Sequence, residues 1–457
     1  MTKDLTSGPP IRLMISFTIP MVLGSLFQQV YSITDTAIVG QVLGTGALAA
    51  VGSTSSVTFL VHGFTGGLCN GFAIPVARSF GSGDRASLRR YVANSIWLCL
   101  FFAAAVTAPA LLLCGDILRW MQTPPDILAD AHAYLFTVFA GVPFVILYSL
   151  AAGMMRAFGD SRTPLAFLIL STVLNVGLDL FFLLGLRTGV WGAALATVIS
   201  QALCGVLSLL ALRARSPNLF PFAEDFRPHG NLMRELCWAG LPMGLESSLT
   251  GIGAILLSAS INALGSTVVA AVTAGNKVSQ VLNCPLSSFS VVMAIYASQN
   301  LGAGQFGRIR RGMRSALLAA ALYSAFSFAA NLLLGRYALL LFLSPQQAAV
   351  LDGARQFLFW NTLFCVSLGF SGLFRCALQG MGYSAVAMLS GVAEMAARSA
   401  MSFTLIPALG ALGAYLANPI AWSVSAVFLA VLYALVLPRV GDRLRSRRPD
   451  GAPSPRA

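Results

Sequence analysis

Long, nearly uncharged runs of apolar residues alternate with short polar segments along the whole chain. A helix needs about 20 apolar residues to cross the roughly 30 Å hydrocarbon core of a bilayer, and twelve of the runs are long enough. We therefore expect an all-α polytopic membrane protein with twelve transmembrane helices. The expected spans are roughly 12–38, 47–75, 91–114, 131–156, 164–185, 190–212, 232–260, 267–296, 314–335, 349–375, 384–406 and 411–437.

The second half of the chain repeats the first at an offset of about 221 residues. Residues 19–21 (IPM) return as 241–243 (LPM), and residues 43–51 (LGTGALAAV) return as 264–272 (LGSTVVAAV). Six helices bring the chain back to the side of the membrane from which it started, so the two halves are parallel repeats. The repeat predicts two six-helix lobes around a central cavity, which is the architecture of a secondary transporter.

The polar segments between the lobes define the expected domain boundaries. We place the first lobe at 1–213, a linker rich in proline and charge at 214–231, the second lobe at 232–437 and a basic tail at 438–457.

Composition supports a membrane protein. Of the 457 residues, 57% are hydrophobic and only 10% are charged, and the mean hydropathy is +0.78. Soluble domains carry about a quarter charged residues, so this chain could not cover a globular surface in water. We expect the cell membrane, with the lipid bilayer as partner and a small molecule as substrate, and a chain that acts as a monomer.

The net charge of +13 follows from where the basic residues lie. With a cytoplasmic N-terminus, 23 of the 29 Lys and Arg, Arg375 among them, fall on inner segments and four on outer ones, while Lys277 and Arg398 lie within spans. This bias predicts that both termini are cytoplasmic. It also accounts for the positive charge without a nucleic-acid partner.

No motif indicates an enzyme. Walker A, HExxH and GxSxG sequences do not occur, and residues 302–307 (GAGQFG), which fit GxGxxG, follow a membrane span and have no surrounding strand pattern. The eight cysteines are scattered and are expected to be small buried hydrophobes. We expect no cofactor.

Ionisable residues inside membrane spans are costly and are therefore candidates for function. Asp179 follows Asn175 by one helical turn, so a carboxylate and an amide oxygen share one face. Thr197, roughly 10 Å from the outer end of the sixth span, lies at a depth comparable to Asp179, roughly 22 Å along the fifth. Oxygen ligands of this kind suit hard cations.

Asp35 lies near the outer end of the first span, with Tyr31 and Gln28 one and two turns before it on the same face. These side chains can converge with Asn175, Asp179 and Thr197 in the first bundle as a site for H+ or Na+. Isolated polar residues bonded to backbone carbonyls are the alternative.

The second bundle does not copy this set. Glu394 and Arg398, four residues apart, are expected to form a structural ion pair. Glu246 and Lys277 could pair with each other or face the substrate cavity. His62, in the second span, could carry protons, and the alternative that we favour is a hydrogen-bonded histidine that serves packing.

At this point the residues resemble a known family, the multidrug and toxic compound extrusion (MATE) transporters. The resemblance runs from Ile19 to about Leu437 and is closest at 175–201 (NVGLDLFFLLGLRTGVWGAALATVISQ), with 156–164 (RAFGDSRTP) and 299–304 (QNLGAG) resembling its loops. It implies export of organic, often cationic and amphipathic, molecules in exchange for Na+ or H+.

The resemblance also implies roles for individual residues. Asp35, Asn175, Asp179 and Thr197 match the family's first-lobe cation site, and Tyr134 and Gln28 match less certain neighbours. Family branches that couple through the second lobe carry acids on the seventh, eighth and tenth spans, whereas this chain has Glu246, Lys277 and only the outer Asp352.

The leading interpretation is therefore a cation-coupled antiporter. A flippase of a lipid-linked substrate from the same superfamily is the alternative, and it would favour a basic rather than an acidic first-lobe cavity. A channel would need a polar ring shared by both halves, which the repeat does not supply.

Overall fold

The computed structural model describes residues 4–446, and every regular element in that range is a helix. The elements are α1 (Pro10–Leu43), α2 (Thr45–Ser82), α3 (Arg85–Leu112), α4 (Cys114–Trp120), α5 (Leu128–Ala140), α6 (Val142–Ala157), α7 (Arg162–Leu180), the π-helix η1 (Phe181–Gly185), α8 (Val190–Arg215), the 3₁₀ helix η2 (Ala223–Phe226), α9 (Gly230–Asn262), α10 (Ser266–Gly302), α11 (Phe306–Leu339), α12 (Ala348–Leu363), α13 (Cys365–Gly380), α14 (Ser384–Phe403), α15 (Leu405–Leu409) and α16 (Ala411–Ser446).

The helices match the expected spans. Within the described residues, nine helices are long and apolar enough to cross a membrane, and two bent pairs, α5 with α6 and α12 with α13, supply two more. The expected span 384–406 corresponds to α14, whose 20 residues include the charged Glu394 and Arg398. The all-α polytopic architecture predicted from the sequence is confirmed.

The two halves are built alike. The fourth span of each half is bent, by 42° at the α5–α6 junction and by 45° at the α12–α13 junction. The junction residues, Gly141 and Phe364, are 223 residues apart. Pro20 in α1 and Pro242 in α9 hold equivalent positions as well, so each lobe repeats the same helix geometry.

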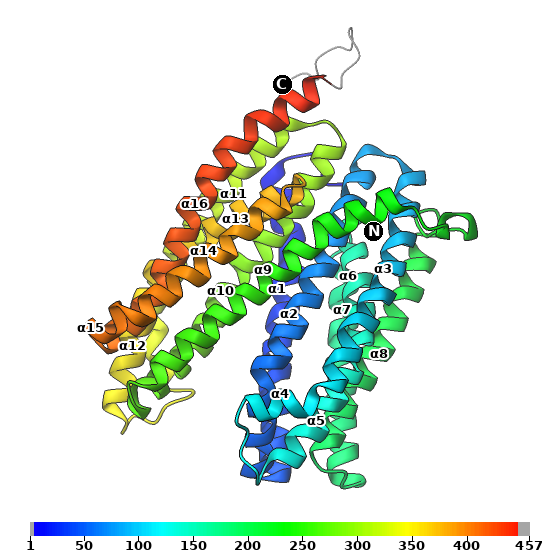
Figure 1. Ribbon diagram of the computed structural model, residues 1–457. Coiled ribbons are helices and arrows are strands. Elements are labelled where there is room, and N and C mark those ends of the chain that lie inside the picture. Colours follow the sequence, from blue (N-terminus) through cyan, green and yellow to red (C-terminus); the bar gives the residue numbers. More distant parts are fainter. Residues whose placement is uncertain (1–3, 447–457) are drawn as a thin grey trace.

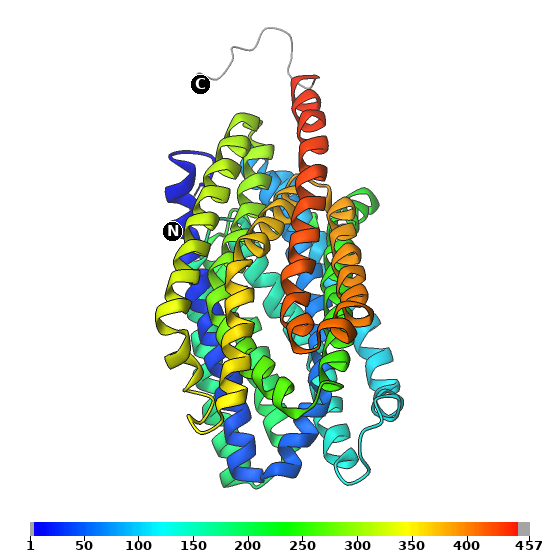
Figure 2. The same cartoon turned by 90° about the vertical axis from the view of Figure 1, so that its left-hand side faces the viewer.

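Figure 1 shows how the two lobes lie relative to one another. Helices α1–α8 and α9–α16 come together in the upper half of the view, where the described end of α16 lies, and lean apart towards the lower end. The view turned by 90° shows the start of the described chain and the described end of α16 in its upper half (Figure 2). We call this the terminus end, and the opposite one the far end. The lobes touch chiefly through α2 with α9 and α10, and α1 with α10.

Glycines bring α2 and α9 into backbone contact. A Cβ atom on Gly71 would lie 2.4 Å from the Cα atom of Gly240, and one on Gly67 would lie 2.5 Å from the carbonyl oxygen of Met243. No side chain fits at such a distance, so the crossing of the two lobes requires glycine at these positions.

The linker between the lobes packs along α3. Arg89 on α3 pairs with Asp225 at 2.9 Å, and Trp97 Nε1 donates to the carbonyl of Phe226 at 2.9 Å. Between the lobes, α8 continues to Arg215 and α9 begins at Gly230. Of the predicted tail, residues 438–446 belong to α16, and residues 447–457 lie outside the described part.

Apolar side chains cover the outside of the helices. On α11, Leu318, Leu322 and Phe326 are exposed at intervals of four residues, which places them on one face. A face of this kind is stable against lipid rather than water.

Candidate functional site

A cluster of polar side chains lies inside the first lobe where α1, α7 and α8 meet. We call Tyr31, Asp35, Asn175, Asp179 and Thr197 the first-lobe cluster. Asn175 and Asp179 are fully buried, with 1% and 0% of their surface exposed. The structure thus brings together the four residues predicted for the cation site, together with Tyr31.

Hydrogen bonds order one side of this cluster. In the amide orientation that satisfies both of its neighbours, Asn175 Nδ2 donates to Asp179 Oδ2 at 3.0 Å, and Asn175 Oδ1 accepts from the hydroxyl and the backbone amide of Thr197, each at 3.2 Å. The Tyr31 hydroxyl lies 3.2 Å from Thr197 Oγ1. These contacts fix the orientation of Asn175 and hold one oxygen of the Asp179 carboxylate.

The two carboxyl groups face each other. Asp35 and Asp179 lie within hydrogen-bonding reach of one another. The Oδ1 atom of each is buried and receives no hydrogen bond from any donor among the described residues. Two adjacent carboxylates repel when both are ionised, so the pair can take up a proton or a small cation.

The local helix geometry explains why these residues meet. The Asn175–Asp179 spacing puts both on one face of α7, and α7 runs on into the π-helix η1. Thr197 lies two turns into α8, on the side that faces α7. The cluster offers carboxylate, amide and hydroxyl oxygens, which suit a monovalent hard ion. No three His, Cys, Asp or Glu side chains in residues 4–446 could share a metal ion.

The predicted neighbours divide into two groups. Tyr134 on α5 lies near enough to Asp35 and Asp179 to interact electrostatically with both carboxyl groups. Gln28 is exposed on α1 and makes no hydrogen bond to the cluster within the described chain. Of the two, the structure places only Tyr134 beside the carboxylates.

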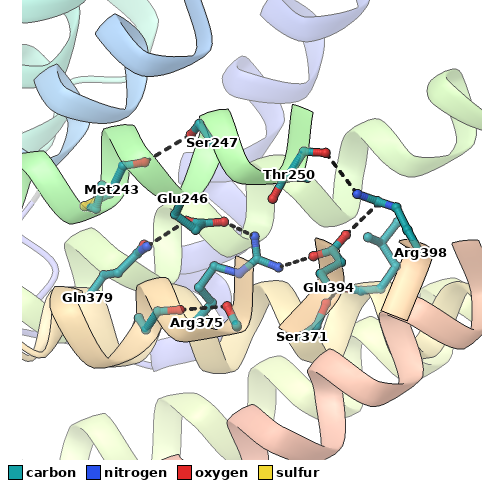
Figure 3. A network of polar contacts seen from close by, with 12 residues as sticks. Met243, Glu246, Ser247, Thr250, Ser371, Arg375, Gln379, Glu394 and Arg398 are labelled. Carbon is teal, nitrogen blue, oxygen red and sulfur yellow. Dashed lines mark hydrogen bonds and ion pairs between the residues drawn. The ribbon is translucent and has the colours of Figure 1, made fainter. Parts of the chain in front are cut away.

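The second lobe holds a different arrangement, which Figure 3 shows from close by. Arg375 on α13 pairs with Glu246 on α9 and lies 3.4 Å from Glu394 on α14. Glu394 in turn accepts from Arg398 at 2.7 Å, and Gln379 Nε2 donates to Glu246 at 3.2 Å. We call the four charged residues the second-lobe network.

The second-lobe network balances its charges. Two glutamates face two arginines. Arg398 also donates from Nε to Asn418 Oδ1 and from Nη1 to the carbonyl of Thr250, both at 3.1 Å. The expected Glu394–Arg398 pair is present but forms half of a larger set. A balanced, hydrogen-bonded network has no unmet charge to attract a coupling ion.

The placement of Arg375 in this lobe was wrong, and for Lys277 the structure removes one of two alternatives, pairing with Glu246, while a place in the substrate cavity stays a prediction. Arg375 was counted on an inner segment, but it lies within α13 and is mostly buried, which lowers that count to 22. Lys277 is exposed on α10 and forms no ion pair with Glu246 in the described structure, because Glu246 pairs with Arg375. No sequence signal singled out Arg375, because Glu246 and Glu394 already had Arg398 and Lys277 as basic residues within expected spans to balance them.

His62 on α2 remains apart from both arrangements. Its Nε2 atom is buried and finds no hydrogen-bond partner within residues 4–446.

Comparison with known proteins decides the family. The MatE family model matches residues 20–181 and again residues 242–404. The chain belongs to this family. The resemblance to the multidrug and toxic compound extrusion transporters is thus confirmed, and the two matches, which start 222 residues apart, coincide with the internal repeat.

Individual MATE relatives cover most of the chain. The Bacillus subtilis (strain 168) protein described as probable multidrug resistance protein YoeA is 29% identical over 66% of this chain and 67% of its own. YpnP of the same organism, also described as a probable multidrug resistance protein, is 26% identical over 84% of this chain and 85% of its own.

Solved MATE structures share the fold. One, described as the outward-facing conformation of a multidrug resistance MATE family transporter, is 20% identical and covers 96% of this chain and 99% of that one, with a TM-score of 0.89. This chain therefore has the MATE fold and is a polytopic membrane transporter.

Proposed function

We propose that this transporter exports organic small molecules, cationic or amphipathic in character, in exchange for H+ or Na+. Membership of the MATE family and relatives described as multidrug resistance proteins support drug export. The observation that carries the coupling part of the proposal is the Asp35–Asp179 pair, which lies inside the lobe and forms no ion pair with any basic side chain of residues 4–446. Asp35, Asn175, Asp179 and Thr197 are the proposed coupling-ion ligands.

The proposed mechanism starts from repulsion between these carboxylates. Binding of a proton or Na+ relieves that repulsion and lets α1 pack more closely against α7. Pro20 removes one backbone hydrogen bond from α1 and gives this helix a point at which to bend. Helix α1 also contacts α10 of the other lobe, so bending of α1 would alter the packing at the lobe interface.

Ion and substrate then compete for different states of one molecule. The ion stabilises the conformation in which the cluster is closed around it, whereas the substrate stabilises the conformation that receives it. Competition through a shared equilibrium is sufficient for antiport. One chain contains both lobes and the whole first-lobe cluster, so we propose that the monomer is the transporting unit.

We further propose that the terminus end faces the cytoplasm of a cell. The basic bias supports this orientation, since 18 of the Lys and Arg that the structure describes belong to segments at that end and four to the far end. With this orientation, the lobes meet at the cytoplasmic side and lean apart towards the outside (Figure 1).

The experiment that tests export is drug-susceptibility profiling of an efflux-deficient host that produces this chain. We expect raised resistance to cationic amphipathic compounds, and loss of that resistance in Asp35→Asn and in Asp179→Asn at normal membrane abundance. The control is Asp130→Asn, the same change at an exposed far-end position of the first lobe. Unaltered susceptibility with the well-produced wild-type chain would contradict the proposal.

A further inference from the structure

The residues before α1 fold back against the end of the other lobe. Leu5 is fully buried, with 0% of its surface exposed. Its amide donates to Gln299 Oε1 at 3.1 Å, and its carbonyl accepts from Asn300 Nδ2 and from Arg308 Nη2, both at 3.2 Å. A single residue of the N-terminal segment thus has both backbone groups and its side chain held.

The segment is shaped for this position. Asp4 Oδ1 accepts from the amide of Thr6 at 2.8 Å and from its hydroxyl at 2.6 Å, which makes a tight turn around Leu5. Arg308 Nε also donates to Asn300 Oδ1 at 2.9 Å, so the two donors to the Leu5 carbonyl hold each other in place. We call Gln299, Asn300 and Arg308 the Leu5 seat.

The seat and the segment belong to different lobes. Residues 4–8 lead into α1 of the first lobe, while Gln299 and Asn300 end α10 and Arg308 begins α11 of the second. The contact therefore joins the lobes at the terminus end, where Ser298 Oγ also donates to the carbonyl of Ile74 at 2.7 Å.

Gln299 links the seat to closure of the lobes. While its Oε1 accepts from Leu5, its Nε2 donates to the carbonyl of Ala157 on α6 of the first lobe at 2.8 Å. Its backbone lies so near α2 that a Cβ atom on Gly81 would come within 1.9 Å of the Gln299 carbonyl oxygen. The side-chain amide of Gln299 can thus make both hydrogen bonds only when the two lobes are in contact at the terminus end.

We propose that residues 4–8 are a latch that holds the terminus end closed, and that Gln299 is the positioning residue that completes the Leu5 seat upon closure. Opening of this end requires the burial of Leu5 and the Gln299–Ala157 bond to be given up together. This assigns a role to the Gln299–Gly304 motif beyond that of a turn. The inference rests on the alternating-access part of the proposed function.

The test measures the separation of the lobes directly. Spin labels at Arg85→Cys on α3 and Arg310→Cys on α11, both exposed at the terminus end, report it by pulsed electron resonance. The background replaces Cys237 and Cys376 by alanine, because the other six cysteines are buried. The test variants are Leu5→Asp and Gln299→Glu, and the matched control is Asn231→Asp, which adds the same charge at an exposed position near the start of α9, outside the latch and its seat.

We expect both test variants to raise the ratio of long to short distances by roughly fivefold or more, the effect of losing a buried hydrogen bond, and Asn231→Asp to leave it unchanged. Gln299→Glu keeps the acceptor for Leu5 but removes the donor to Ala157, so it decides the matter if Leu5→Asp does not fold. A distance distribution in a folded Gln299→Glu protein that equals the wild type would overturn the latch. The labels report lobe separation without transport, so failure of the latch and failure of the export proposal are distinguishable.

Discussion

Glu246 and Glu394 each receive a guanidinium group, whereas Asp35 and Asp179 face one another and form no ion pair within residues 4–446. Both sets lie inside lobes of the same helical design, so the difference resides in the side chains alone. Charges that are already paired and hydrogen-bonded gain little by binding an ion. Two adjacent carboxylates without a basic partner repel each other, and a bound proton or cation relieves that repulsion. This contrast supports the proposal that the second-lobe network is structural and that the first-lobe cluster couples transport to an ion.

The second-lobe network predicts a specific pattern of stability. Arg375→Met leaves Glu246 as an unpaired charge, and breaking a buried pair costs about 3–5 kcal/mol, so we expect lower membrane abundance and a lower melting temperature. The double variant Glu246→Gln, Arg375→Met removes one charge of each sign, retains the Glu394–Arg398 pair and should recover part of the loss. Abundance and thermal stability in detergent measure both effects.

The control for that experiment is Arg355→Met, the same change at a half-exposed side chain whose partner, Asp352, lies 3.8 Å away at the far end. Its stability should stay near that of the wild type. Wild-type stability of Arg375→Met itself would show that Arg375 does not hold the network together.

Residues of the first-lobe cluster could be predicted from the sequence where their spacing along a helix places them on one face. One helical turn between Asn175 and Asp179 fixes their common face, and depth along neighbouring helices brings Thr197 level with them. It failed for Arg375, because hydropathy ended the tenth span there, whereas α13 continues to Gly380. Gln28 shares the helical spacing of Tyr31 but remains exposed, since spacing does not say which face a neighbouring helix covers.

At the scale of elements, the crossing of α2 and α9 sets how closely the lobes approach. Gly71→Ala would push a methyl group against the backbone of Gly240, and no side-chain rotation can relieve that contact. We expect this variant to separate the lobes at the crossing and to lower the melting temperature, as overpacking commonly costs about 1–3 kcal/mol.

The matched control for Gly71→Ala lies in the same helix. A Cβ atom on Gly66 would meet nothing within 4 Å, so Gly66→Ala should be neutral or slightly stabilising. Thermal unfolding of the purified variants compares the two, and equal melting temperatures would contradict the role given to the crossing.

Element positions were largely predictable because hydropathy marks spans directly. The bends were not. Pro143 follows Gly141 closely and offers a local reason for the first bend, but residues 361–367 (NTLFCVS) contain neither glycine nor proline. The second bend therefore depends on packing in the folded lobe. The same holds for the N-terminal segment, whose partners lie almost 300 residues away.

For the whole molecule, the proposed orientation in the membrane rests on the basic residues. Asn218 in the linker and Asp126 at the far end are both exposed, and the proposal places them on opposite sides of the bilayer, so cysteines introduced there test it. In intact cells, a membrane-impermeant maleimide should label Asp126→Cys and leave Asn218→Cys unlabelled until the membrane is opened. The reverse pattern would invert the proposed orientation.

We propose above all that the Asp35–Asp179 pair couples transport to an ion gradient. The most direct measurement is substrate movement in proteoliposomes under an imposed Na+ or proton gradient, for the wild type, Asp130→Asn and the double variant Asp35→Asn, Asp179→Asn. We expect gradient-driven transport by the first two and none by the double variant, because the amides keep the shape of the cluster but neither repel each other nor titrate. Full gradient-driven transport by the double variant would contradict it.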